Sequence, residues 1–307
     1  MQAPMRDLEI HRKTLNKLSR ELRPIAAFLD DPGVTDILLN PDGRIWLDTI
    51  DRGKFPTEVT MDPMAAATLI GTIASMLGTV VTETHPVVEG ELPLDGNRFE
   101  GLIPPIVANP VFAIRKKALL VFTLADYVEK GSMTPEQQSV IENGILTRKN
   151  ILVCGGTASG KTTFANAVLA AIAELTPEHR VVIIEDTIEL QSKIADTVAL
   201  RTSEEISMTK LLRYSLRLRP DRIIVGEVRG PEALDLLMAW NTGHPGGIGT
   251  IHADSAPEAL DRLGELITLT GAPPMSGLIH RVVDMVISLQ KVDGVRKITE
   301  VLQVAGR

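Results

Sequence analysis

The sequence of 307 residues contains a single cysteine, Cys154, and only 3% aromatic residues. One cysteine excludes an intrachain disulfide and a zinc site built from several cysteines, and it favours a reducing compartment. An excess of positive charge is also missing, since the formal net charge is −7. A dedicated nucleic-acid-binding protein carries a basic surface, so the composition disfavours direct, sequence-specific binding of nucleic acid.

Long hydrophobic runs are scarce as well. Residues 64–81 carry no charge and reach the lower length limit of a membrane span. Five apolar residues of this stretch fall on one face of a helix, namely Leu69, Ile73, Met76, Leu77 and Val80. No basic flank or aromatic belt marks its ends. We therefore expect a buried amphipathic helix here, and the charged N-terminus predicts no secretory signal.

Residues 1–120 are predicted to form an α+β domain in which strands and helices come in blocks. The expected elements are a helix over 1–22, a hairpin of strands 34–39 and 44–48, the helix just described, and strands over 99–106 and 111–115. Residues 121–140 are interpreted as a linker. Within it, Thr134 is expected to cap a helix that has Pro135 at its first position.

The pattern changes in the remaining part, which is assigned to a second domain over 141–307. Strands are expected over 150–154, 181–185, 222–225 and 249–252, and each is followed by a helical pattern. Such alternation predicts an α/β fold with a mostly parallel sheet and helices on both faces. A hairpin over 283–304, with its turn at Asp293 and Gly294, is expected to close the sheet.

A glycine-rich loop follows the first of these strands and matches the pattern G-x-x-x-x-G-K-[ST]. Its residues are Gly155, Gly156, Thr157, Ala158, Ser159, Gly160, Lys161 and Thr162, and the predicted nucleotide-binding segment also includes Thr163. The glycines let backbone amides surround phosphate oxygens at the start of the next helix. The lysine reaches the β- and γ-phosphates, and the Thr162 hydroxyl binds magnesium. The loop therefore predicts a site for ATP and Mg²⁺.

Two acids follow later strands of the predicted sheet. Glu185 ends the run IIE, and Glu227 follows the run IIVG, where Gly226 occupies the usual position of an aspartate. Because the carboxyl ends of parallel strands face the ligand, Glu185 and Glu227 are candidates for binding magnesium or its water shell. Glu227 is also the candidate for orienting and deprotonating the attacking water. The alternative for Glu185 is a loop acid that caps a turn.

A histidine and several arginines complete the candidate groups. His252 ends a strand and is able to sense the γ-phosphate, although the pattern alone favours a structural histidine. Phosphoryl transfer also requires a cation for the spreading charge. The candidates are Arg98, Arg115, Arg201, Arg217, Arg219 and Arg229, each of which has a surface charge as its alternative reading.

Several segments together resemble the secretion-ATPase superfamily, whose members are hexameric rings that power type IV secretion, type II secretion and type IV pili. The resemblance is carried by GGTASGKTTFANA, IIEDTIEL and LRLRPDRIIVGEVRGPEALDLLMAWNTGHPGGIGTIHADS, with NPDGRIWLD and RFEGLIPPIVANPVFAIRKK upstream. It extends from about residue 20 to 305 and is most specific over 150–262. It implies a RecA-like P-loop ATPase domain that follows a smaller α+β domain.

The resemblance also implies roles for single residues. The glycine loop corresponds to the family's Walker A motif, Glu185 with Asp186 to its Asp box, Glu227 to the Walker B glutamate and His252 to the His box. Two further residues, Arg98 and Arg115, correspond to first-domain arginines that reach the phosphates across the domain or subunit boundary.

Within the superfamily, the single cysteine excludes the four-cysteine zinc module of type II assembly ATPases. An extra C-terminal segment typical of pilus retraction ATPases is also missing. Both absences favour the conjugation and type IV secretion branch. That branch implies a cytoplasmic homohexamer, peripheral contact with the inner membrane, and partners among the inner-membrane components of the channel.

Two other function classes remain open at this point. A ring motor that translocates nucleic acid is disfavoured by the acidic balance and by the lack of an aromatic and basic strand-binding platform. A nucleotide-gated binding module that hardly turns over is disfavoured by the full set of acids and arginines.

Overall fold

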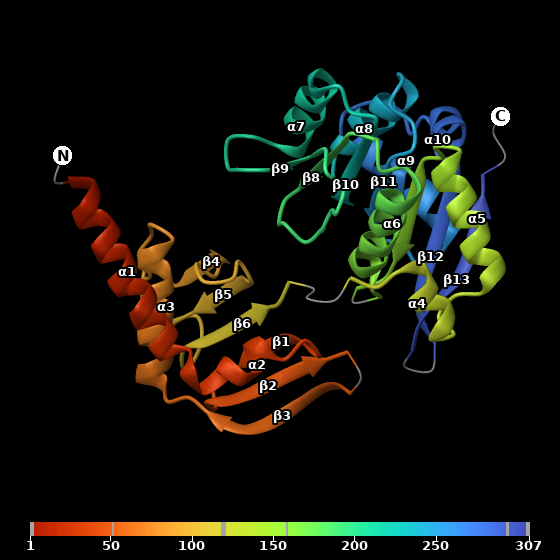
Figure 1. Ribbon diagram of the computed structural model, residues 1–307. Coiled ribbons are helices and arrows are strands. Elements are labelled where there is room, and N and C mark those ends of the chain that lie inside the picture. The colour runs from red at the N-terminus through yellow and green to blue at the C-terminus, as the bar shows by residue number, and fades with distance from the viewer. Residues whose placement is uncertain (1–2, 51, 118–120, 158, 293–294, 305–307) are drawn as a thin grey trace. The chain divides into compact units, whose positions relative to one another are not determined.

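The computed structural model describes residues 3–50, 52–117, 121–157, 159–292 and 295–304. The chain divides into two compact units, Met1–Leu120 and Val121–Arg307 (Figure 1). Each unit has its own hydrophobic core. Among the helices of the described residues, none combines the length and the apolar character that a membrane crossing requires.

The first unit is built on a six-stranded sheet of order β3-β2-β1-β6-β5-β4, in which every neighbouring pair is antiparallel. Its strands are β1 (Val34–Leu39), β2 (Arg44–Thr49), β3 (Gly53–Thr60), β4 (Val87–Glu91), β5 (Arg98–Leu102) and β6 (Val111–Arg115). Its helices are α1 (Ala3–Glu21), η1 (Arg23–Ile25), α2 (Ala26–Asp30) and α3 (Pro63–Met76). The α+β class predicted from the sequence is therefore confirmed for this part of the chain.

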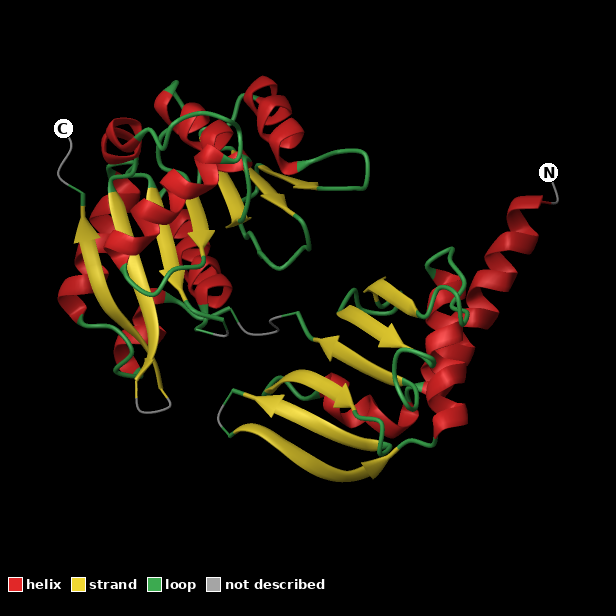
Figure 2. Cartoon of the chain, turned by 180° about the vertical axis from the view of Figure 1, so that it is seen from behind, coloured by secondary structure: helices red, strands yellow, loops and turns green. Residues whose placement is uncertain are grey.

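One face of this sheet is covered by helices, as Figure 2 shows. Inward side chains of the strands, such as Ile37, Ile45 and Phe99, form one cluster with Leu69 and Ile73 of α3. The side chains that alternate with them point to the opposite face and are half-buried or exposed. The sheet thus has one apolar face and one polar face, as is common in antiparallel sheets.

The uncharged stretch 64–81 forms a shorter helix than predicted. Asp62 caps α3 by accepting from the backbone N–H groups of Met64 and Ala65, and the helix ends at Met76. Gly78 has a φ of +76°, which takes the chain out of the helical conformation. Val80 was expected on the apolar helix face but lies beyond the helix and is 75% exposed.

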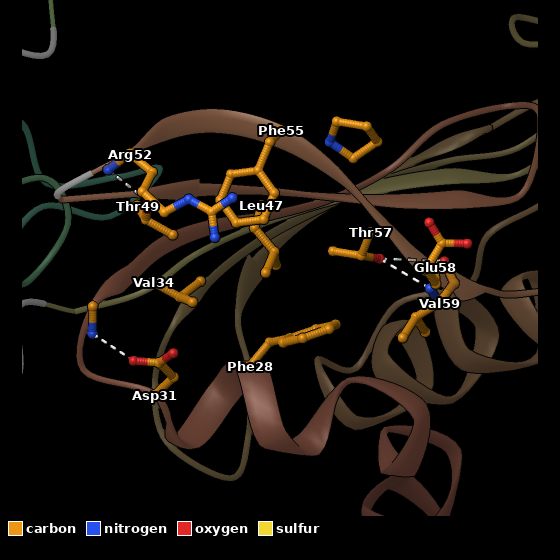
Figure 3. A pocket seen from close by; sticks show the side chains of 12 residues that line it. Phe28, Asp31, Val34, Leu47, Thr49, Arg52, Phe55, Thr57, Glu58 and Val59 are labelled. Carbon is orange, nitrogen blue, oxygen red and sulfur yellow. Dashed lines mark hydrogen bonds between the residues drawn. The ribbon is translucent and has the colours of Figure 1, made fainter.

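A pocket of about 600 Å³ lies in the first unit beside the edge strand β3 (Figure 3). Phe28 of α2, Leu47 of β2 and Phe55 of β3 contribute to its wall, and the Arg52 guanidinium lies 4.3 Å from the centre of the Phe55 ring. The inward side chains of β3 are only half-buried. The pocket therefore marks the place where the helices leave the sheet edge incompletely covered.

The second unit contains a seven-stranded sheet of order β13-β12-β7-β11-β10-β8-β9. Its strands are β7 (Ile151–Gly155), β8 (Val181–Glu185), β9 (Thr197–Arg201), β10 (Arg222–Val228), β11 (Ile248–Ile251), β12 (Met285–Val292) and β13 (Val295–Gln303). All neighbouring pairs are parallel except β12 and β13, which form the predicted closing hairpin. The predicted turn of this hairpin, Asp293 and Gly294, lies outside the described residues.

Helices cover both faces of this sheet, as the two views in Figures 1 and 2 show. They are α4 (Leu124–Glu129), α5 (Pro135–Leu146), α6 (Lys161–Leu175), α7 (Met208–Ser215), η2 (Leu216–Leu218), α8 (Glu232–Asn241), α9 (Ala256–Thr268) and α10 (Ser276–Val282). Side chains of β7 alternate between two core clusters: Ile151 and Val153 join one, whereas Leu152 and Cys154 join the other. The predicted α/β fold with a mostly parallel sheet is confirmed.

Residues 121–140, interpreted above as a linker, are part of the second unit. Helix α4 occupies Leu124–Glu129, and Leu124 and Met133 are buried in the same cluster as Phe164 of α6. The linker interpretation is wrong because a short helix and two widely spaced apolar side chains give little periodic signal. Thr134 does cap α5: its hydroxyl accepts from the Gln137 backbone N–H, and the Gln137 Oε1 accepts from the Thr134 backbone N–H.

Candidate nucleotide-binding site

The glycine-rich segment connects the end of β7 with the start of α6. A Cβ atom added at Gly155 would lie 2.5 Å from the carbonyl oxygen of Leu289, so only glycine fits there. Gly160 has a φ of +95°, in the left-handed region that glycine adopts without strain. This strand-loop-helix connection is the backbone arrangement that binds phosphate at a helix N-terminus. Ala158 lies outside the described residues.

Lys161 is folded back over the loop that precedes it. Its Nζ donates to the carbonyl oxygens of Gly155 at 2.8 Å and of Gly156 at 3.0 Å. Burial lowers the pKa of Lys161, and the negative charge of Glu227 opposes this shift. The ammonium group is therefore held at the loop before any phosphate contacts it.

The same loop contains a buried hydroxyl that lacks a partner. Ser159 is 5% exposed, and its Oγ has no hydrogen-bond partner within the described part of the chain. Thr162 and Thr163 lie half-buried in the first turn of α6. Buried polar atoms are normally satisfied, so an unsatisfied hydroxyl beside an ammonium group fits a site that receives an anion. The residues present therefore fit a polyphosphate ligand.

The described residues contain no group of three or more His, Cys, Asp or Glu side chains that would hold a metal ion alone. Mg²⁺ commonly takes only one or two protein ligands and obtains the rest from phosphates and water. The Thr162 hydroxyl, in the first turn of α6, is in the position that suits such an ion. The site therefore fits magnesium bound together with a nucleotide.

Glu185 ends β8 and is 4% exposed. Its Oε1 accepts from the backbone N–H groups of Glu189 at 3.0 Å and Leu190 at 2.9 Å, so the carboxylate braces the loop that follows the strand. A Cβ atom added at Gly226 would lie 2.8 Å from Glu185 Cγ. The side chain of Glu185 thus leaves no room for a side chain at position 226 of β10, the strand that neighbours β8 in the sheet. This accounts for glycine where an aspartate was expected.

Glu227 lies near the carboxyl end of β10 and is half-buried. Arg229 donates a hydrogen bond from Nη2 to Glu227 Oε2, and this contact also forms an ion pair. The Thr250 hydroxyl donates to the carbonyl oxygen of Gly226 at 2.6 Å, which fixes the strand just before Glu227. Sequence reasoning placed Arg229 among six candidates but gave no sign of its partner.

His252 directly follows β11 and is exposed. Its Nε2 lies 3.1 Å from the Thr157 Oγ1, so the histidine contacts the glycine-rich loop. The sequence pattern alone favoured a structural histidine. The contact with the loop instead supports the alternative, in which the histidine belongs to the site.

Arg98 and Arg115 lie in the first unit, directly opposite each other on β5 and β6. They belong to a row of charged residues that are paired in register across all six strands. In strand order the row contains Lys54, Asp48, Asp36, Arg115, Arg98 and Glu91. Arg115 donates from Nε to Asp36 Oδ1 at 3.0 Å. Like charges opposite each other destabilise a sheet, so the two arginines require acids or a bound anion nearby.

The other candidate arginines take separate positions. Arg201 donates from Nε to the carbonyl oxygen of Asp186 at 3.3 Å, in the loop after β8. Arg217 lies in η2, and Arg219 adopts a φ of +52° after it. Arg229 differs from these in that its side chain contacts the carboxylate of Glu227.

Within the second unit, the structure brings the predicted groups to one edge of the sheet. The glycine loop follows β7, Glu185 ends β8, Glu227 lies near the end of β10 and His252 follows β11. These are the carboxyl ends of neighbouring parallel strands, where open α/β sheets bind their ligands. The fold and this group of residues define the second unit as a P-loop nucleotide-binding domain.

Comparisons with known proteins agree with this class. The family model described as "Type II/IV secretion system protein" matches residues 19–301, and the chain belongs to this family. It is 45% identical over 301 residues to the "Probable conjugal transfer protein TrbB" of Sinorhizobium fredii, which covers 98% of this chain and 92% of the relative. It is 44% identical over 303 residues to the "Conjugal transfer protein TrbB" of Rhizobium radiobacter, with 98% and 94% covered.

Solved structures show the same fold. The VirB11 ATPase from the Brucella suis type IV secretion system, in complex with sulphate, matches with 27% identity and a TM-score of 0.51, covering 93% of this chain and 97% of that chain. The Legionella pneumophila ATPase DotB matches with 19% identity and a TM-score of 0.66, covering 91% and 79%. The resemblance to secretion ATPases inferred from the sequence is confirmed.

Proposed function

We propose that this protein hydrolyses Mg-ATP to power a bacterial type IV secretion apparatus that carries out conjugative DNA transfer and pilus assembly. The observation that carries the proposal is the meeting of Lys161, Glu227 and His252 at one edge of the parallel sheet. The relatives named conjugal transfer proteins TrbB support the process that the hydrolysis serves.

Each group has a role in this reaction. The amides of the glycine loop and Lys161 bind the phosphates, with Gly155 and Gly160 allowing the tight backbone path. Thr162 would hold magnesium, which when bound would supply positive charge to the phosphates. Glu227 orients the attacking water and accepts its proton. Glu185 holds the loop after β8 beside this water and supports the metal's water shell.

His252 contacts the loop through Thr157 and reports on the γ-phosphate. Arg98 and Arg115 supply positive charge to the phosphoryl group in the transition state. The two arginines lie directly opposite each other on β5 and β6, which places two positive charges side by side for an anion. Since these arginines and the glycine loop belong to different units, hydrolysis is coupled to rigid-body motion.

The working form is proposed to be a cytoplasmic homohexamer at the inner membrane, in contact with membrane components of the secretion channel. The family membership and the TrbB relatives support this assembly. Light scattering of the full chain with and without ATP tests it. A hexamer in either state supports the ring, whereas a monomer in both states contradicts it.

Phosphate release by the purified full chain tests the hydrolysis. We expect release that needs Mg²⁺ and that Lys161→Ala reduces by about 10²-fold or more, because a charge-assisted phosphate contact is lost. Lys210→Ala is the matched control, since Lys210 of α7 is exposed and its ammonium donates to the carbonyl oxygen of Glu205, which precedes the helix. Equal release by wild type and Lys161→Ala would contradict the proposal.

The same assay tests the alternative of a nucleic-acid motor. Strong stimulation of phosphate release by single-stranded DNA, with a steep fall as the salt concentration rises, would favour that alternative.

A further inference from the structure

The turn that follows β10 presents Arg229 in a fixed backbone position. The carboxylate of Glu232 accepts from the backbone N–H groups of Arg229 and Gly230, both at 2.7 Å. Glu232 is 8% exposed, and a Cβ atom added at Gly230 would lie 2.8 Å from its Oε2. The backbone at Arg229 is therefore held firmly, while its side chain is exposed and able to change partner.

The guanidinium of Arg229 lies among the charged groups of the candidate site. It forms the ion pair with Glu227, and the acids Asp186 and Glu189 in the loop after β8 are close enough to affect it. The charges of both Arg229 and Glu227 also act on Lys161. Arg229 and the glycine loop thus follow the carboxyl ends of two parallel strands, β10 and β7, on the same edge of the sheet.

In the structure the guanidinium of Arg229 and the carboxylate of Glu227 bind each other. A Glu227 carboxylate oxygen that accepts from the guanidinium of Arg229 is occupied by that contact and is not free to accept from a water molecule. A γ-phosphate bound at Lys161 would bring negative charge to the same place and would compete with Glu227 for Arg229. Glu227 would then be released to contact water.

We propose that Arg229 is the residue that distinguishes ATP from ADP in this site by exchanging Glu227 for the γ-phosphate. ATP then both removes the cation from the base and gains a contact that ADP lacks. The proposal rests on the proposed hydrolysis of ATP and adds the residue that links recognition of the γ-phosphate to activation of Glu227.

The purely structural alternative is that Arg229 braces the end of β10. Exposed ion pairs contribute little to stability, and Glu232 already fixes this turn. A brace would affect ATP and ADP equally. Discrimination between the two nucleotides therefore separates the alternatives.

The test measures the binding of Mg-ADP and of a non-hydrolysable ATP analogue to the full chain, by displacement of a fluorescent nucleotide. In Arg229→Ala we expect ADP affinity within about 2-fold of wild type, analogue affinity lower by about 10-fold or more, and kcat lower by about 10²-fold. Arg229→Lys should be intermediate, because an ammonium keeps the charge but not the planar fork. Arg262→Ala is the matched control, since it removes an exposed arginine that pairs with Glu265.

A double-mutant cycle sharpens the test. Glu227→Gln removes the competing carboxylate, so we expect it to bind the analogue several-fold more tightly than wild type, with ADP unchanged. In Glu227→Gln/Arg229→Ala this gain should disappear. A gain that persists without Arg229, or an Arg229→Ala protein that matches Arg262→Ala in both affinities and in kcat, overturns the exchange. If the wild-type protein releases no phosphate, the proposed hydrolysis fails. If the wild-type protein is active but these variants bind the ATP analogue as tightly as wild type does, the exchange alone fails.

Discussion

Each unit contains an arginine that donates to a carboxylate, and the two pairs differ in how the fold holds them. Their exposure is nearly the same: 60% and 21% for Arg115 and Asp36, against 60% and 25% for Arg229 and Glu227. Asp36 and Arg115 are Cα partners on neighbouring strands, so the ladder between β1 and β6 sets their distance. Glu227 and Arg229 are two residues apart, and rotation of side chains alone separates them.

This difference predicts different roles for Asp36 and Glu227. Asp36 holds the Nε of Arg115 and fixes the direction of the guanidinium, which makes Asp36 a positioning residue. In the proposed exchange, Glu227 holds Arg229 only until a bound γ-phosphate competes for it. A pair across strands therefore orients a cation permanently, whereas a pair within a turn can exchange its partner.

The largest expected effect comes from removing the first-unit cation. Arg115→Ala should lower kcat by about 10³-fold, because an arginine that stabilises the phosphoryl transition state contributes at least this much. Thermal unfolding should hardly change, since an exposed ion pair adds less than about 1 kcal/mol. Lys54→Ala, at the far end of the same charged row, is the control and should keep wild-type turnover. A fully active Arg115→Ala protein would contradict the role proposed for Arg115 in phosphoryl transfer.

The native thiol of the second unit should also react more slowly than a thiol introduced into the first unit. Cys154 is buried between β7 and its covering helices, and burial raises its pKa to about 11. At pH 8 its thiolate fraction alone should make labelling about 100-fold slower than that of an ordinary cysteine. Val80→Cys in the first unit, at an exposed position, provides the comparison within one protein. Equal labelling rates would show that the second core opens readily.

Removal of the positioning acid should have a smaller effect than removal of the arginine. We expect Asp36→Ala to lower kcat by about 10-fold, since Arg115 keeps its charge but loses the contact that orients it. Asp36→Asn should recover part of the activity through its remaining oxygen. The double variant Asp36→Ala/Arg115→Ala should be no slower than Arg115→Ala. Additive losses would show that Asp36 acts independently of Arg115.

The smallest effect concerns acid stability of the second unit. His179 Nδ1 accepts from the Nε of the buried Arg222 at 3.0 Å, and burial, followed by the charges of Arg222 and Arg148, lowers the pKa of His179. A lowered pKa leaves stability complete above the unfolded value of about 6.5 and reduces it as the pH falls below that value. The urea midpoint should therefore fall between pH 7 and pH 5.

Trp240 provides the signal for this measurement, because it is buried in the second unit. In a Trp46→Phe background, its fluorescence follows that unit alone. His179→Asn should lower the midpoint at pH 7 but should show a weaker dependence on pH. An identical pH dependence in both proteins would contradict the assignment.

Sequence reasoning reached the second unit more completely than the first. The glycine loop lies within one continuous segment, and the alternation of strands and helices from β7 onward repeats a strong pattern. Strands β3 and β4 went unpredicted because they are sheet edges, where burial is partial and Pro56 or Gly90 interrupts the pattern. Strand β9, also at an edge, has no fully buried residue.

The side-chain contacts of the site residues could not be predicted from the sequence for a different reason. The pairing of Asp36 with Arg115 depends on strand register across 79 positions, which no local pattern encodes. The close approach of the Glu185 side chain to Gly226 joins two strands, and it leaves no room for a Cβ atom where an aspartate was expected. Arg229 was visible as a candidate, but its contact with Glu227 appears only when the turn is built.

The most direct test of the central claim is phosphate release by Glu227→Gln at nucleotide concentrations where binding is measured to be saturated. We predict that this variant binds Mg-ATP at least as tightly as wild type and that its kcat falls by about 10²-fold or more, because the base is lost while the phosphate contacts remain. Turnover at the wild-type rate with a saturated site would contradict the assignment of Glu227 and the account built on it.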